Sequence, residues 1–165
     1  MKKFIMALAF GLVVSSANVE AAKGKVVQPQ DPLEIVGDRC APGDVIFYGQ
    51  NQKHTKEVLI CQWGTNVFYS FGKIGKPAEL DLKLDSTEVE RVIEDDEYRN
   101  SEVLFFKNGD IVYEIGASVD KMLGDKAEPV SYIRVTRYAK GQLAEIVLDE
   151  ATVVNGIRGS FVPGN

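Results

Sequence analysis

Histidine, tryptophan and cysteine are scarce in this chain, which has one, one and two of them among 165 residues. The 19 Lys and Arg residues against 24 Asp and Glu residues give a formal net charge of -5, and the cations form no dense run. A nucleic-acid binder is therefore not expected, because phosphate contacts depend on clustered cations. The hydrophobic fraction of 45% is ordinary for a globular protein and excludes collagen-like, rod-like and highly charged disordered chains.

Long apolar runs are missing after the N-terminal segment. Lys2 and Lys3 precede an apolar run over residues 4–14, and small residues follow up to Ala22. This order is typical of a secretory signal peptide, with cleavage after Ala21 or Ala22. The run is shorter than the ~20 residues of a membrane span. We expect residues 1–21 to be removed, which leaves a periplasmic or secreted chain with a net charge of -6 and no membrane span.

Export would place the two cysteines in an oxidising compartment. In an oxidising compartment Cys40 and Cys61 are expected to form a disulfide, since only one intramolecular pairing exists. A zinc site is the alternative, but two cysteines and His54 fall short of four ligands. The sequence therefore predicts a disulfide and neither a metal nor a cofactor.

Short runs rich in β-branched and aromatic residues dominate the chain, and turn residues separate them. We expect residues 22–38 to form an extended lead-in and residues 39–165 to form one all-β domain. The expected fold is a mainly antiparallel sandwich or barrel of about eight strands with at most one or two short helices. Leu80, Leu82 and Leu84 alternate with charged residues, so one side of that strand should face the core. Residues 87–99 fit either a short helix or a strand.

Two hairpins can be placed by their turns. Asn108-Gly109 suits a two-residue turn, which would pair Lys107 with Asp110. In the second hairpin, over residues 131–148, a turn at Lys140-Gly141 would pair Val135 with Ile146.

The segment around the second cysteine carries a motif. The motif consists of Leu59-Ile60-Cys61, then Tyr69-Ser70-Phe71-Gly72-Lys73-Ile74-Gly75-Lys76, then Glu79-Leu80. It resembles a family of small exported bacterial proteins in which a cysteine-containing strand precedes a Y-x-F-G-x-x-G-K-x-E-L segment. Here two residues, Pro77 and Ala78, stand between the lysine and the glutamate. The resemblance implies export and a β-rich fold, and it implies no mechanism.

Residues suited to catalysis are few. His54 lies in a polar loop with no nucleophile motif, and the acidic run 94–97 lacks the oxygen spacing and central glycine of a calcium loop. The sequence therefore predicts a protein that is not an enzyme. Two alternatives stay open. One is a carboxylate- or metal-dependent hydrolase that uses Asp95, Asp96 and Glu97 with His54. The other is a small-ligand carrier whose cavity is lined by aromatic residues, namely Phe47, Phe68, Phe105 and Tyr113.

The expected function is binding or inhibition of another protein. The chain is similar in type to periplasmic lysozyme inhibitors, which are small, exported, β-rich and commonly disulfide-linked. Those proteins insert a loop with Ser-Gly and Tyr-type residues into a cleft, whereas this chain has a Gly-Ser pair at 159–160. Its acidic charge would favour a basic partner such as a cell-wall hydrolase. The loops 49–56 and 72–77 should present the contact residues, which we expect to be His54, Tyr69, Lys73 and Lys76.

Overall fold

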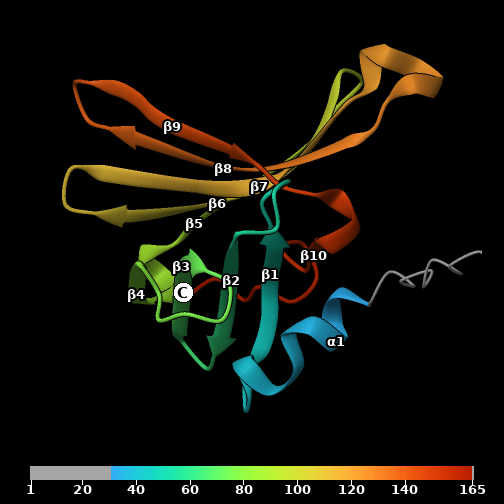
Figure 1. Cartoon of the computed structure of the whole chain (residues 1–165). Coiled ribbons are helices and arrows are strands. Elements are labelled where there is room, and N and C mark those ends of the chain that lie inside the picture. Colours follow the sequence, from blue (N-terminus) through green and yellow to red (C-terminus); the bar gives the residue numbers. More distant parts are fainter. Residues whose placement is uncertain (1–30, 165) are drawn as a thin grey trace, which may run out of the picture.

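The computed structural model of the chain describes residues 31–164 (Figure 1). The predicted signal peptide and the first part of the predicted lead-in lie outside these residues. Ten strands form two antiparallel sheets of five strands each, so the expected all-β, mainly antiparallel class is confirmed. None of the helices among residues 31–164 is long and apolar enough to cross a membrane.

The first sheet has the strand order β10-β1-β2-β3-β4. Its strands are β1 (Asp44–Gln50), β2 (Lys56–Trp63), β3 (Asn66–Lys73), β4 (Leu80–Asp85) and β10 (Val154–Asn155). The second sheet has the order β5-β6-β7-β8-β9. Its strands are β5 (Glu90–Asp95), β6 (Arg99–Asn108), β7 (Ile111–Asp120), β8 (Pro129–Arg137) and β9 (Gly141–Val147). The ambiguous residues 87–99 thus form the 3-10 turn η2 (Ser86–Glu88), strand β5 and a tight turn.

The core lies between the two sheets, whose strands run crosswise (Figure 1). The first sheet contributes Ile60 and Tyr69, and the second contributes Leu104, Ile115 and Ile133, all of them at most 1% exposed. On β4, alternate residues Leu80, Leu82 and Leu84 pack against this core, as their spacing predicts. Burial of apolar side chains from both sheets is the main stabilising contribution to such a sandwich.

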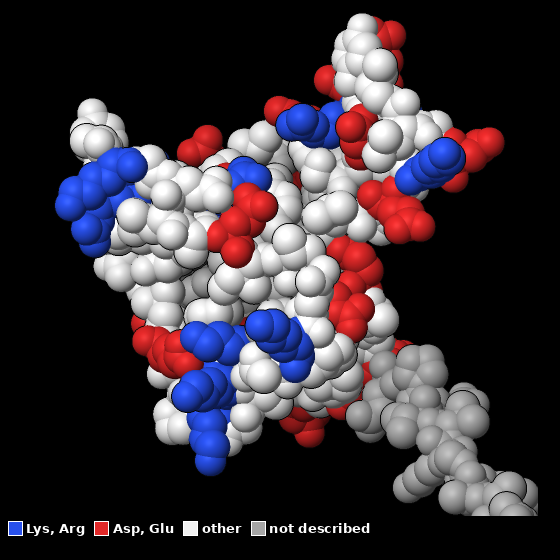
Figure 2. Space-filling model, turned by 45° about the horizontal axis from the view of Figure 1, so that its top comes forward, with Lys and Arg blue, Asp and Glu red and all other residues white. Residues whose placement is uncertain are grey.

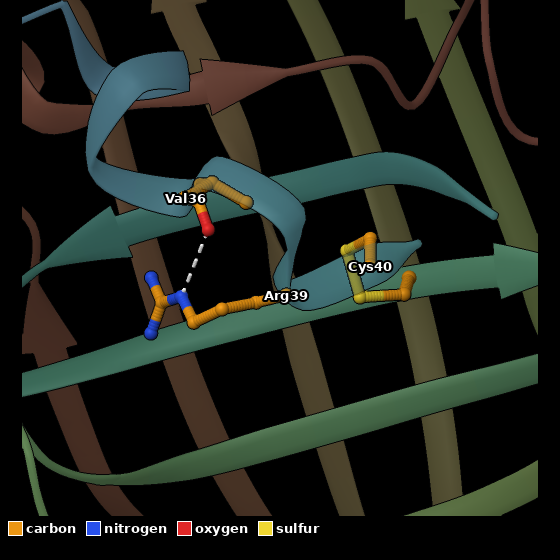
Figure 3. Close-up of a disulfide and its surroundings, with 4 residues drawn as sticks. Val36, Arg39 and Cys40 are labelled. Atoms are coloured by element: carbon orange, nitrogen blue, oxygen red, sulfur yellow. Dashed lines mark hydrogen bonds between the residues drawn. A yellow bond between two sulfur atoms is a disulfide. The ribbon is translucent and has the colours of Figure 1, made fainter. Parts of the chain in front are cut away.

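A short helical segment covers part of the outer face of the first sheet. It consists of α1 (Pro32–Val36) and the 3-10 helix η1 (Gly37–Cys40), so the expectation of an extended lead-in fails for these residues. The helix begins there because the Asp31 side chain accepts a hydrogen bond from the Leu33 amide and a proline occupies the first turn. Val36 is buried in a second apolar cluster with Tyr48, and the Cys40–Cys61 disulfide ties the segment to β2 (Figure 3).

Both predicted hairpins form, with registers shifted by two residues. β6 and β7 pair Asn108 with Ile111, so the turn residues are Gly109 and Asp110. Gly109 has a φ of 62°, as the first central residue of a type II′ turn requires. β8 and β9 pair Val135 with Ala144 because a longer turn precedes Gly141 and a bulge interrupts β9. A shift by two residues leaves each side chain on its expected face. Between the β9 bulge and the turn the shift is three residues, because Arg137 pairs with Gly141 and not with the expected Ala144.

An arm extends from one end of the second sheet beyond the sandwich (Figure 1). We define the arm as residues 94–101 and 117–130, which include the β5–β6 turn and the connection from β7 to β8. That connection contains η3 (Lys121–Lys126).

The last of the described residues return to the first sheet. After η4 (Glu150–Thr152), β10 pairs with β1, and Ile157 and Phe161 enter the core. Two long side chains hold this segment. The amide group of Gln62 bonds both to the nitrogen and to the oxygen of Val162, and the Arg91 guanidinium donates to the carbonyl oxygens of Ile157 and Phe161.

Removal of the disulfide should lower the free energy of unfolding by about 3 kcal/mol, because the bond closes a loop that spans 21 positions of the sequence. Denaturant unfolding of the Cys40→Ser, Cys61→Ser double variant measures the loss. Addition of dithiothreitol should reproduce it in the wild type and change nothing in the variant. Equal stability of the oxidised wild type and the variant would contradict the prediction.

Candidate functional site

Three of the four expected contact residues meet around one hollow. His54 from the β1–β2 loop, Lys73 at the end of β3 and Lys76 from the β3–β4 loop line a space of about 530 Å³. The two loops are joined where the Ile74 amide donates to the Thr55 carbonyl oxygen at 3.2 Å. Within residues 31–164 Lys73 and Lys76 form no ion pair, so the hollow has a cationic rim.

His54 also connects the two sheets. Its Nε2 lies 2.8 Å from a carboxylate oxygen of Asp149, which follows β9, and its Nδ1 lies 2.9 Å from Oε1 of Gln50. The side-chain nitrogen Nε2 of Gln50 donates to the Tyr48 hydroxyl, which in turn donates to the Glu57 carboxylate. Because Nε2 of Gln50 is held by Tyr48, the side-chain oxygen of Gln50 points toward the His54 ring. Both ring nitrogens therefore lie within hydrogen-bond distance of an oxygen atom.

Tyr69 does not belong to this surface. Its side chain is 1% exposed and lies between Phe106 and Tyr113, with ring centroids 5.2 and 5.7 Å away. Burial raises the pKa of its hydroxyl. We therefore remove Tyr69 from the set of partner contacts, because a core residue cannot reach a partner without unfolding of the sheet.

The residues of the hydrolase alternative are held in separate networks. His54 bonds to Asp149 and Gln50, whereas Asp95 bonds to Lys121, and Asp96 accepts from backbone amides of its own turn. Within residues 31–164 no group of three or more His, Cys, Asp or Glu side chains is placed to hold a metal ion.

The four aromatic residues of the carrier alternative do not line a common cavity. Phe47 and Tyr113 pack in the core between the sheets. Phe68 lies on the outer face of the first sheet, and Phe105 lines a hollow on the outer face of the second. The interior between the sheets is packed by side chains, as expected from the density of protein cores.

The acidic run instead forms a hydrogen-bonded turn at the tip of the arm. Asp96 accepts from the amides of Tyr98 and Arg99, both at 2.8 Å, which closes the β5–β6 turn. The Lys121 ammonium donates to the Asp95 carboxylate at 2.7 Å and to the Asp96 carbonyl oxygen at 2.6 Å. The Lys121 amide in turn donates to the Tyr98 carbonyl oxygen. Lys121 thus ties the β7–β8 connection to the β5–β6 turn.

Large apolar side chains stand exposed on this tip. Tyr98 is 56% exposed, Met122 69% and Leu123 56%. The arm also carries seven carboxylates and three cationic side chains. Figure 2 shows acidic side chains gathered on the arm, apart from a group of Lys and Arg side chains elsewhere. Sequence reasoning missed these apolar residues, because residues 117–126 have no period that separates a buried from an exposed face.

Ordered polar residues form the base of the arm on the outer face of the second sheet. Tyr132 and Arg134 both donate to one oxygen of Glu114, at 2.6 and 2.8 Å, and Arg134 also donates to Glu145. Burial, followed by the bond to Glu114, raises the pKa of the Tyr132 hydroxyl. Three neighbouring strands are thereby linked side chain to side chain, and the arm has a firm base.

Acid should loosen the tip of the arm. The bond from Lys121 lowers the pKa of Asp95, and the bonds from the backbone of Arg99 and Tyr98 lower that of Asp96, both from 3.8. A lowered pKa in the folded state means that these bonds are intact at neutral pH and are lost as the pH falls below about 3.8 through the lowered values. An NMR titration of the Tyr98 and Arg99 amides measures this. The Asp96→Asn side chain keeps an oxygen that accepts these hydrogen bonds but does not titrate. In this variant the chemical shifts of the two amides should therefore change less on acidification.

Truncation of Tyr69 tests its reassignment to the core. Tyr69→Ala should lower the free energy of unfolding by about 3–5 kcal/mol, as expected for a large aromatic side chain removed from a packed interior. Tyr98→Ala, which removes an exposed tyrosine, should change it by about 0.5 kcal/mol or less. Thermal and denaturant unfolding of the two variants measures these changes. If both variants lost equally little free energy of unfolding, Tyr69 would be a surface residue and the reassignment would be wrong.

No family model, curated protein or solved structure matches this chain. A function for it therefore has to be argued from the chemistry of its own surfaces.

Proposed function

We propose that the protein is an exported, non-enzymatic binding or inhibitory protein whose arm docks on a cationic protein such as a cell-wall hydrolase. The observation that carries the proposal is the tip of the arm, where exposed Tyr98, Met122 and Leu123 stand among carboxylates. Large apolar and aromatic side chains supply most of the binding energy at protein interfaces. The surrounding acids attract a partner of positive charge and exclude acidic ones.

The shape and rigidity of the arm suit insertion into a concave partner. The arm projects beyond the sandwich (Figure 1), and Lys121 and Asp96 hold its two loops in one arrangement. A tip that is ordered before binding loses little conformational entropy in the complex. An inhibitor needs these properties, because it has to fill a cleft and stay there.

Export supports the choice of partner. The N-terminal sequence has the order of a signal peptide, and the Cys40–Cys61 disulfide fits an oxidising compartment. The basic proteins met in such a compartment include enzymes that cleave the anionic cell wall. The contacts expected at His54, Lys73 and Lys76 are not used in this proposal, because the cationic hollow that they line would repel a cationic partner.

Binding and inhibition of a cationic lysozyme by the mature chain test the proposal. The Tyr98→Ala, Met122→Ala double variant should weaken binding by at least about 2 kcal/mol, because both side chains would be buried at the interface. Higher salt should slow association. The matched control is Tyr138→Ala, which removes a tyrosine that is 86% exposed at the opposite end of β8 and should leave affinity unchanged.

Two outcomes would contradict the proposal. One is a mature protein that neither binds nor inhibits cationic muramidases. The other is binding that is unaffected by the two arm substitutions but is lost in Tyr138→Ala.

A further inference from the structure

Trp63, the single tryptophan of the chain, lies at the rim of a groove on the first sheet. Trp63 is the last residue of β2 and is 59% exposed on the outer face of the first sheet. The groove has a volume of about 370 Å³. Its apolar lining includes Leu59, Phe68 and the Cys40–Cys61 disulfide. An exposed tryptophan beside other apolar groups is characteristic of a contact site, since such a side chain is normally buried.

The groove exists because the helical cover of this sheet is incomplete. The apolar cluster under α1 and η1 takes Tyr48 from β1 and Leu59 and Cys61 from β2. Figure 3 shows η1 against the outer face of the sheet, with the disulfide at its end. Beyond β2, the outward residues of β3 and β4 form an open floor. In register these are Ser70 and Asp81 beside Leu59, and Phe68 and Lys83 beside Cys61.

Polar groups reach the groove from both sides. Arg39 lies on the η1 side, where Glu57 already neutralises it through a 2.6 Å ion pair. Asp81 lies on the β4 side and forms no ion pair with any residue of the described chain. The hydroxyl of Ser70 lies between them in the strand register. The groove therefore offers hydrogen-bond donors and acceptors at its margins and an apolar, aromatic surface between them.

This combination selects the chemical class of the ligand. A phosphate or sulfate would find the Arg39 guanidinium already paired with Glu57. The other cation at the floor is Lys83, whose ammonium lies 5.7 Å from the centroid of the Phe68 ring, and the Asp81 carboxylate offsets its charge. The charges around the groove therefore sum to zero and give an anion no net attraction. A wholly apolar ligand would leave the Asp81 carboxylate without hydrogen-bond partners at a desolvation cost. A sugar ring has C–H groups on its faces and hydroxyls at its edges. The electron-rich face of an indole attracts such C–H groups, and carboxylate, hydroxyl and guanidinium groups bond to the hydroxyls.

We propose that the groove binds a neutral saccharide, with one sugar ring against Trp63 and its hydroxyls on Asp81, Ser70 and Arg39. This site is separate from the arm, so a saccharide can bind whether or not the arm has a protein partner. In an exported protein, glycans of the cell envelope are the natural source of such a ligand.

Tryptophan fluorescence tests the proposal directly, because Trp63 is the only tryptophan in the sequence. The probes are chitotriose, cellotriose and maltotriose, with glucose 6-phosphate as the anionic comparison. At least one neutral trisaccharide should give a saturable change in emission, and glucose 6-phosphate should bind at least about tenfold more weakly. Failure of all three trisaccharides to bind, or preference for the phosphate, would overturn the proposal.

Calorimetry on variants identifies the residues involved. Trp63→Ala should abolish saccharide binding, Trp63→Phe should weaken it, and Asp81→Asn should lower affinity about tenfold. Circular dichroism should show all three folded, since both positions are on the surface. Tyr98→Ala, on the arm, should bind saccharide as the wild type does. Binding that survives Trp63→Ala would overturn the proposal, and so would an emission change given by a protein partner and by no saccharide.

Discussion

Packing of the two sheets across one another decides which residues can be buried. Because the strands run crosswise, the first sheet covers only the middle of β6, β7 and β8 (Figure 1). Leu104, Ile115 and Ile133 lie in this region and are in the core. Of the described residues, none from the arm joins the core cluster. The arm is therefore ordered by polar contacts such as those of Lys121 and Asp96, and its large apolar side chains stay exposed.

The outer face of the first sheet is likewise covered only in part. The short segment of α1 and η1 reaches over β1 and β2, and the disulfide fixes it there. It is too short to reach β3 and β4, whose outward residues stay open. The groove is open because the helical segment that Cys40 anchors is long enough to cover β1 and β2 but not β3 and β4. The arm and the groove are two uncovered parts of one sandwich, and their chemistry differs in that the arm is acidic while charges in the groove are balanced.

Much of the fold could be predicted because strand periodicity is local. The alternation of Leu80, Leu82 and Leu84 gave the correct inward face of β4, and the two hairpins were found from their turn residues. Their registers were wrong by two residues, since the choice between Asn108-Gly109 and Gly109-Asp110 depends on the backbone angle of a single glycine. The helical turns of residues 32–40 were missed because so short a helix depends on its cap and its disulfide.

The candidate surfaces were less predictable than the fold. In β3 both Phe68 and Tyr69 are aromatic, so the sequence does not show which faces the core, and Tyr69, expected as a partner contact, is a core residue. The residues His54, Lys73 and Lys76 line one hollow, a proximity that the sequence did not predict. Tyr98 and Met122 come close because Arg99 pairs with Asp120 at the far end of the β6–β7 hairpin, and Trp63 is exposed because the cover ends before it. Such features depend on tertiary structure, and a local pattern does not contain them.

The pairing of β10 with β1 has a consequence for biogenesis. Phe47 and Tyr48 of β1 pair with Asn155 and Val154, which come much later in the sequence. A nascent chain that emerges from the ribosome or a translocation channel presents the backbone groups of β1 long before their partners exist. Unpaired strand edges recruit other strands, and contacts so distant in sequence form late. Until β10 has emerged, this edge of β1 is open to pairing with strands of other chains, and a chaperone that covered the edge until β10 could pair would lower that risk.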